Sequence, residues 1–202
     1  MIDAALLPPL RAVLDAPARG LVARGVTADQ VTLSGFGIGL LALPALWIGW
    51  YGLALALILA NRLADGLDGI MARHVGATDR GAFLDIALDF FFYAAVPLGF
   101  AMAAPENAQA AAVLICAFVG TGSSFLAFAV IAAKRGMQAD AFPSKGIFYL
   151  GGLTEGFETI VVFTLMCLWP AWFVPLAYGF AFACLVTTVL RWLQGWRAFS
   201  DL

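Results

Sequence analysis

Residues 63–91, "LADGLDGIMARHVGATDRGAFLDIALDFF", place five carboxylates between two long apolar runs. Asp65 and Asp68 are spaced i, i+3, and Asp85 and Asp89 are spaced i, i+4, so each pair shares one face of a helix. The connection between the two helices is short. We therefore expect antiparallel neighbours whose aspartates converge near one end.

Four converging carboxylates repel one another and lose hydration, and a hard divalent cation resolves this. Carboxylate oxygens are the ligands that Mg²⁺ and Mn²⁺ prefer, and two such ions can share bridging carboxylates. Gly66, Gly69 and Gly81 leave room for a phosphate or nucleotide close to the backbone. An ion-pair cluster and the cation pathway of a transporter are the alternatives that the spacing leaves open.

The rest of the chain predicts an all-α polytopic membrane protein. Of its 202 residues 63% are hydrophobic and only 12% are charged, whereas a soluble domain is about a quarter charged. A membrane crossing needs roughly 20 apolar residues. We predict six transmembrane helices, at about 30–51, 52–73, 80–104, 108–133, 147–169 and 171–193, preceded by an amphipathic segment, 1–29, with no pattern of a cleaved signal peptide. Residues 30–202 would then form the catalytic domain.

Basic residues predict the orientation. Ten of the eleven Lys and Arg residues flank one set of span ends, and the loops "GWYG", "AAPENAQ" and "WPAW" contain neither. The positive-inside rule makes the basic side cytoplasmic, so both termini and the aspartates are expected there. The eleventh, Arg62, lies inside the second span, three residues before Asp65. It is expected to neutralise that aspartate or to hold it in place.

The three cysteines, Cys116, Cys167 and Cys184, lie in apolar stretches without metal-ligand spacing. They indicate neither a disulfide framework nor a zinc site. A net charge of −2 says little about partners, because the acidic excess is local. We expect membrane lipids as partners, and no nucleic acid.

Taken together, these residues resemble the CDP-alcohol phosphotransferase family, whose motif is D-x2-D-G-x2-A-R-x7/8-G-x3-D-x3-D. The chain matches every fixed position of this motif, and six spans with cytoplasmic termini also suit the family. The matching residues are Asp65, Asp68, Gly69, Ala72, Arg73, Gly81, Asp85 and Asp89.

The resemblance implies transfer of a substituted phosphate from a CDP-linked donor, expected to be CDP-diacylglycerol, to an acceptor hydroxyl, with release of CMP. Asp65, Asp68, Asp85 and Asp89 would bind Mg²⁺ or Mn²⁺, expected as two ions, and Asp89 would also be the general base. A soluble CDP-alcohol with a diacylglycerol acceptor is the alternative within the enzyme class. The resemblance also implies phospholipid synthesis at a bacterial inner membrane, and a homodimer.

Further donor contacts are expected from the motif and from the stretch before the first span. Gly69, Ala72, Arg73 and Gly81 would accommodate the nucleotide, with weaker contacts from Asp29 and Thr32. An N-cap and a small-residue packing face at Gly35, Gly37 and Gly39 would explain the stretch before the first span equally well.

The acceptor pocket is expected to use later residues at the cytoplasmic side. Basic residues would suit a phosphorylated acceptor, although the positive-inside rule also supplies them. Two acids, i, i+3 on the fifth span, would suit a polyol or an amino alcohol, or would pair with the bases. The candidates are Lys134, Arg135, Lys145, Arg191, Glu155 and Glu158. The acceptor stays open between a phosphorylated alcohol, a small neutral or amino alcohol and a lipid hydroxyl.

A cation-coupled transporter remains the rival from another class. Transporter sites lie near the bilayer midplane, often between internal repeats. The sequence shows no repeat, and the aspartates lie at helix ends, so an enzyme is favoured.

Overall fold

The computed structural model of the chain describes residues 2–137 and 152–200, and the regular structure within these ranges is helical. Eight α-helices and two short 3₁₀ turns follow one another in the described parts. Their bounds are α1 Ile2–Ala23, α2 Ala28–Leu40, α3 Ala42–Trp47, α4 Tyr51–Val75, α5 Asp79–Ala103, η1 Pro105–Asn107, α6 Ala108–Lys134, α7 Gly156–Leu168, η2 Pro170–Trp172 and α8 Phe173–Phe199.

The predicted first span is built from α2 and α3, which meet at Leu41. Thr27 caps α2: its hydroxyl accepts the Gln30 N–H, and the Gln30 side chain accepts the Thr27 N–H at 3.0 Å. This capping box fixes where the helix begins. Pro44 lies in the first turn of α3, where a missing N–H is tolerated.

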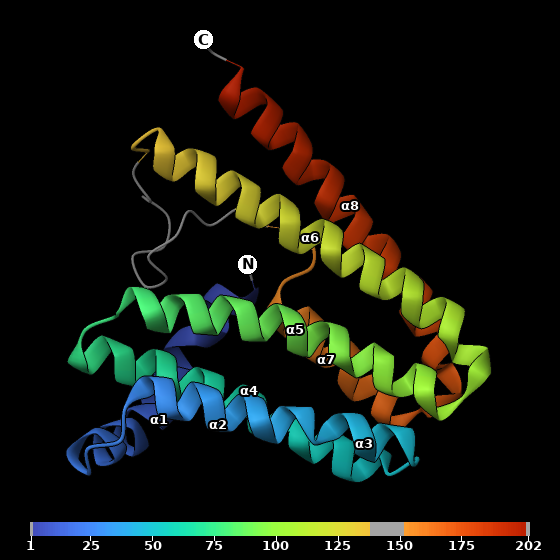
Figure 1. Cartoon of the computed structure of the whole chain (residues 1–202), viewed down its shortest axis with the longest axis horizontal. Helices are drawn as coiled ribbons and strands as arrows, with labels where there is room; N and C mark the ends of the chain where they lie inside the picture. Colours follow the sequence, from blue (N-terminus) through green and yellow to red (C-terminus); the bar gives the residue numbers. More distant parts are fainter. Residues whose placement is uncertain (1, 138–151, 201–202) are drawn as a thin grey trace.

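The long helices form an elongated bundle. In Figure 1, α2 to α5 lie together, and α6 and α8 run side by side at an angle to them. The short helix α7 lies beside α4. The core between these helices is aromatic and aliphatic: Phe100 stacks on Phe173 with ring centroids 4.6 Å apart, and Phe92 and Phe163 are also fully buried.

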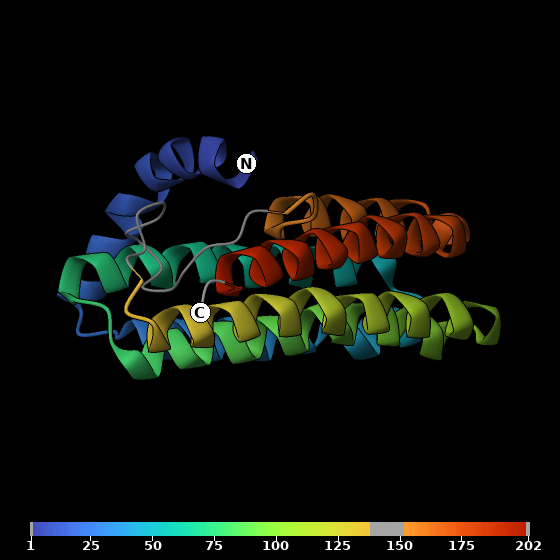
Figure 2. The same ribbon diagram turned by 90° about the horizontal axis from the view of Figure 1, so that it is seen from above.

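Helix α1 crosses the outside of the bundle near the end where α4 and α5 join (Figure 2). Leu14 and Ala18 of α1 pack with Ile70 and Met71 of α4 in a small separate core. The division of the chain at residue 29 stays a prediction.

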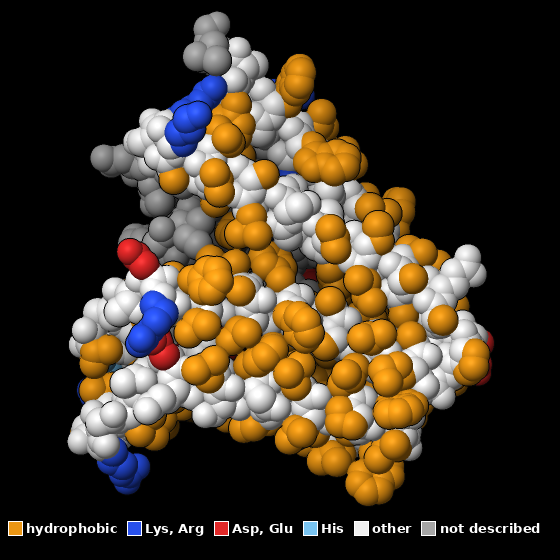
Figure 3. Space-filling view, viewed as in Figure 1, with side chains coloured by type: hydrophobic (Ala, Val, Ile, Leu, Met, Phe, Trp, Pro, Cys, Tyr) orange, Lys and Arg blue, Asp and Glu red, His pale blue; other side chains and the backbone are white. Residues whose placement is uncertain are grey.

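Within residues 2–137 and 152–200, four helical segments are long and apolar enough to cross a membrane: Ala28–Trp47, Asp79–Ala103, Pro105–Lys134 and Pro170–Phe199. Charged residues from Arg62 to the end of α4 keep this helix out of the set. Figure 3 shows hydrophobic side chains over most of the visible face, with most charged side chains along the side where α4 and α5 join and α6 ends. Six spans and the cytoplasmic orientation stay predictions.

The predicted fifth span, 147–169, is not one continuous helix, and its predicted start at residue 147 lies outside the described residues. Residues 152–155 are not helical, and α7 begins only at Gly156, so it has 13 residues. Its first turn is defined by polar side chains: the Glu155 N–H is accepted by Glu158, and the Glu155 carboxylate accepts backbone N–H groups in return. Such a capping box starts a helix where an apolar pattern alone does not show a boundary.

Candidate active site

Helices α4 and α5 bring three of the motif aspartates together. Gly76, with φ 98°, ends α4, and the Thr78 hydroxyl caps α5 by accepting the Gly81 N–H at 3.0 Å. This tight turn makes the two helices antiparallel neighbours. As a result, one carboxylate oxygen each of Asp65, Asp68 and Asp85 lies within 4.8 Å of the others.

Helix α2 closes the other side of this cluster. The Thr32 hydroxyl donates to the Asp68 carboxylate, which is buried, and also lies 3.1 Å from the Ala28 carbonyl oxygen. Helix α2 can come this close because Gly35 faces Ala64: a Cβ added at Gly35 would lie 2.5 Å from the Ala64 Cβ. A small polar pocket results, lined by all four motif aspartates together with Thr32 and Arg62.

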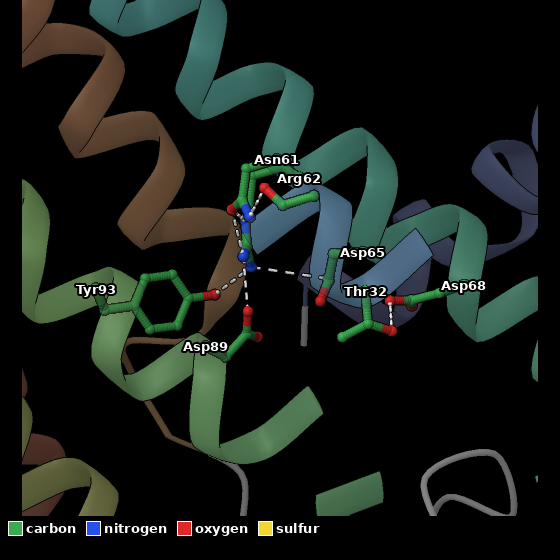
Figure 4. Close-up of polar contacts among 8 residues, drawn as sticks. Thr32, Asn61, Arg62, Asp65, Asp68, Asp89 and Tyr93 are labelled. Atoms are coloured by element: carbon green, nitrogen blue, oxygen red, sulfur yellow. Dashed lines mark hydrogen bonds and ion pairs between the residues drawn. The ribbon is translucent and has the colours of Figure 1, made fainter. Parts of the chain in front are cut away.

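Asp89, one turn after Asp85 on α5, contacts Arg62. The Arg62 Nη2 donates to the Asp89 Oδ1 at 2.6 Å, whereas the Arg62 Nη1 lies 3.7 Å from the Asp65 Oδ2 (Figure 4). Spacing along α4 predicted the Asp65 contact. The shorter contact, to Asp89 on the next helix, could not be predicted from that spacing.

Two further residues hold Arg62, and sequence reasoning missed both. The Asn61 Oδ1 accepts from the Arg62 Nε at 2.8 Å and from its Nη2 at 2.6 Å, while the Tyr93 hydroxyl accepts from Nη1 at 3.1 Å. Asn61 itself donates to the Gly35 carbonyl oxygen at 3.0 Å. Tyr93 continues the i, i+4 spacing of Asp85 and Asp89, so this periodicity was the signal that could have found it.

The residues expected to accommodate a nucleotide lie around the end of α4 and the start of α5. Next to Gly69 there is space for a ligand, because an added Cβ would meet only the Arg73 Nη1, at 4.0 Å. Ala72 is half-buried and Arg73 is exposed. At Gly81, an added Cβ would lie 3.1 Å from the Asp29 Oδ1, so this glycine lets α2 and α5 approach.

Asp29 is engaged in an ion pair between two helices. Its Oδ2 accepts from the Arg80 Nε at 2.7 Å, and the Arg80 Nη2 is 2.5 Å from the same oxygen. This pair joins the first turns of α2 and α5. The contact gives Asp29 a structural role, and its contact with a nucleotide stays a prediction.

The basic candidates for the acceptor pocket are dispersed. Lys134, at the end of α6, is exposed, and Lys145 lies outside the described residues. Arg135 donates to the carbonyl oxygens of Ala198 and Phe199, at 3.3 and 3.0 Å, and so ties α6 to the end of α8. Arg191 is 9% exposed and its Nη1 donates to the Thr121 carbonyl oxygen at 3.0 Å.

The two glutamates form the capping box of α7 described above. The Glu155 Oε1 also accepts the Gly152 N–H at 3.2 Å, which orders the segment before the helix. Arg191 lies against the same segment, since a Cβ added at Gly152 would be 3.2 Å from its Nη2. The structure thus gives Glu155 and Glu158 a part in starting α7, which the sequence did not indicate.

Comparisons with known proteins agree with this geometry. The chain is 52% identical over 203 residues to the inner membrane protein YnjF of Escherichia coli (strain K12), covering 100% of this chain and 98% of that one. It is 31% identical over 96 residues to an archaetidylinositol phosphate synthase of Pyrococcus horikoshii, covering 47% of this chain and 51% of the relative.

A solved structure of similar fold is the phosphatidylinositol phosphate synthase PgsA1 of Mycobacterium tuberculosis with CDP-DAG bound. Its TM-score is 0.68 at 25% identity, over 92% of this chain and 94% of that one. The same enzyme in complex with manganese and citrate gives a TM-score of 0.67 at 27% identity, over 91% and 88% of the two chains.

The family model of CDP-alcohol phosphatidyltransferases matches residues 25–195, which include all four motif aspartates. The protein therefore belongs to the CDP-alcohol phosphatidyltransferase family and is a phosphatidyl transferase of phospholipid synthesis.

Proposed function

We propose that this enzyme transfers the phosphatidyl group of CDP-diacylglycerol to the hydroxyl of an acceptor alcohol and releases CMP. The observation that carries the proposal is the convergence of Asp65, Asp68 and Asp85 within 4.8 Å, in one pocket with Asp89. A similar solved structure holds CDP-DAG, which supports a lipid donor.

The three converging carboxylates fit a divalent metal ion. Hard oxygen donors suit Mg²⁺ and Mn²⁺, and a similar structure contains manganese. A bound ion would neutralise the donor pyrophosphate and stabilise the charge that develops during transfer. Asp65, Asp68 and Asp85 would hold it. The Thr32 hydroxyl fixes the orientation of the Asp68 carboxylate.

Asp89 is proposed as the general base. In the step that we propose, the acceptor oxygen bonds to the phosphorus that carries diacylglycerol, and the bond from that phosphorus to the CMP oxygen breaks. The acceptor proton passes to the Asp89 carboxylate, and CMP leaves with the bonding electrons. Asp89 lies in the same pocket as the other aspartates, as a base close to the reacting phosphorus must.

We place the enzyme in an inner membrane with its aspartates at the cytoplasmic side. An inner-membrane relative, the apolar helices and the charged side of the bundle support this placement (Figure 3). A phosphorylated polyol is the acceptor that we propose, and the names of two similar proteins, a phosphatidylinositol phosphate synthase and an archaetidylinositol phosphate synthase, support it. A homodimer stays a prediction.

The test uses the purified full-length protein in detergent with radiolabelled CDP-diacylglycerol, Mg²⁺ or Mn²⁺ and separate acceptors. These are glycerol 3-phosphate, inositol 1-phosphate, inositol, serine and diacylglycerol. We expect one acceptor to give CMP and a labelled lipid, and Asp89→Asn to form both far more slowly. The proposal fails if every acceptor leaves the donor intact while soluble CDP-alcohols are consumed.

A further inference from the structure

Arg62 is a fixed positive charge inside the aspartate pocket. It lies in α4 one turn before Asp65, within the predicted second span, and its side chain is 14% exposed. A charge at such a position is costly unless it is paired or faces water. Its position at the aspartates therefore calls for an explanation.

The guanidinium is held from several sides. Asn61 accepts two hydrogen bonds from the guanidinium and Tyr93 accepts another, with distances of 2.6 to 3.1 Å. Its Cζ also lies over two aromatic rings, 4.9 Å from the Phe92 centroid and 5.2 Å from that of Tyr93. Arg62 thus has a defined location, unlike a flexible surface arginine.

This location is between two of the motif aspartates. Its Nη2 is 2.6 Å from the Asp89 Oδ1 and its Nη1 is 3.7 Å from the Asp65 Oδ2, so the guanidinium bridges α4 and α5 as a metal ion would (Figure 4). Asp65, Asp68 and Asp85 form the group whose oxygens lie within 4.8 Å, and in the described residues that group does not include Asp89.

We propose that Arg62 serves as a built-in second cation, so that the free enzyme binds one divalent ion at Asp65, Asp68 and Asp85 while Arg62 holds Asp89. This proposal rests on the metal site of the proposed function. A second ion bridging Asp65 and Asp89 would need the space of the guanidinium, and the two positive charges would repel each other. Arg62 is thereby a positioning residue for Asp89, and it acts through charge as well as through contact.

The proposal predicts a metal stoichiometry. Full-length protein in detergent is stripped of metal and titrated with Mn²⁺. Bound ions per chain are counted by elemental analysis, and the electron paramagnetic resonance (EPR) spectrum distinguishes isolated from coupled ions. We expect one isolated Mn²⁺ in the wild type. Arg62→Gln, which removes the charge, is expected to bind two coupled ions, and Arg62→Lys, which keeps it, to bind one.

The variant Asp89→Asn keeps the test informative if Arg62→Gln does not fold. We expect it still to bind one isolated Mn²⁺, because Asp89 is not a ligand of the first ion. Two ions in the wild type, one ion in a folded Arg62→Gln protein, or loss of an ion in Asp89→Asn would each overturn the role of Arg62. Absence of any bound Mn²⁺ in the wild type would instead overturn the metal site itself, and the proposed function with it.

Discussion

The close approach of α2 to α4 gives a steric prediction that can be worked out from the coordinates. In Gly35→Ala the new Cβ would lie 2.5 Å from the Ala64 Cβ, whereas carbon atoms in contact are about 3.5–4.0 Å apart. The helices must therefore separate by about 1 Å. Gly37→Ala, on the same helix, is the matched control, because no atom would lie within 4 Å of a Cβ added at Gly37.

Both substitutions gain about 1 kcal/mol of helix propensity, but only Gly35→Ala incurs the overpacking cost of about 1–3 kcal/mol. Gly35→Ala should consequently unfold at a temperature about 2–12 °C below that of Gly37→Ala, at about 2–4 °C per kcal/mol for a chain of this size. Thr32 lies one turn before Gly35 and bonds Asp68, so helix separation also disturbs the aspartate pocket. A displacement of about 1 Å can lower a rate by about 100-fold.

The assay is thermal unfolding in detergent alongside CMP release from CDP-diacylglycerol. Adding Ala64→Gly to Gly35→Ala removes the clash, and the double variant should recover most of the CMP release. Equal unfolding temperatures and equal rates for Gly35→Ala and Gly37→Ala would refute the reasoning, as would a double variant with no recovery.

Three other outcomes follow from the site. Asp89→Asn should lower CMP release by about 10²–10⁴-fold if Asp89 is the general base; a rate near that of the wild type would exclude this role. Asp85→Asn should lose most Mn²⁺ affinity in a titration, whereas Asp79→Asn, outside the converging group, should retain it; equal losses would contradict the assignment of ligands. Glu155→Ala should destabilise the protein by about 0.5–2 kcal/mol through loss of the α7 cap, with the acceptor KM unchanged. A raised KM at unchanged stability would instead place Glu155 in the acceptor pocket.

The aspartate pocket could largely be anticipated, because helical spacing and a short turn determine it. An i, i+3 pair and an i, i+4 pair on antiparallel neighbours must converge, and the structure brings Asp65, Asp68 and Asp85 together. Their roles as ligands, and that of Asp89 as base, stay predictions. The packing of α2 on α4 also follows from small residues, since Gly35 and Gly39 are buried against α4.

Which of two nearby partners a side chain contacts, and where a helix begins, could not be anticipated from the sequence. Spacing assigns Arg62 to Asp65 on its own helix, but the closer oxygen belongs to Asp89 because of how α4 and α5 are rotated. Glu155 and Glu158 looked like acids inside a span. The i, i+3 spacing that suggested ligand binding is also the spacing of a capping box. The two interpretations can be distinguished only once it is known that α7 begins after Glu155.

The shortness of α7 has a consequence for how this part of the chain can lie in a bilayer. Thirteen residues of helix are about 20 Å long, while the hydrocarbon core of a bilayer is about 30 Å thick. The non-helical residues 152–155 at its start have backbone groups that lipid cannot satisfy, and side chains bond three of their N–H groups: Glu155 accepts that of Gly152, Thr187 that of Thr154 and Glu158 that of Glu155. A helix too short to cross a membrane alone is thus continued by a non-helical segment that carries its own hydrogen-bond partners.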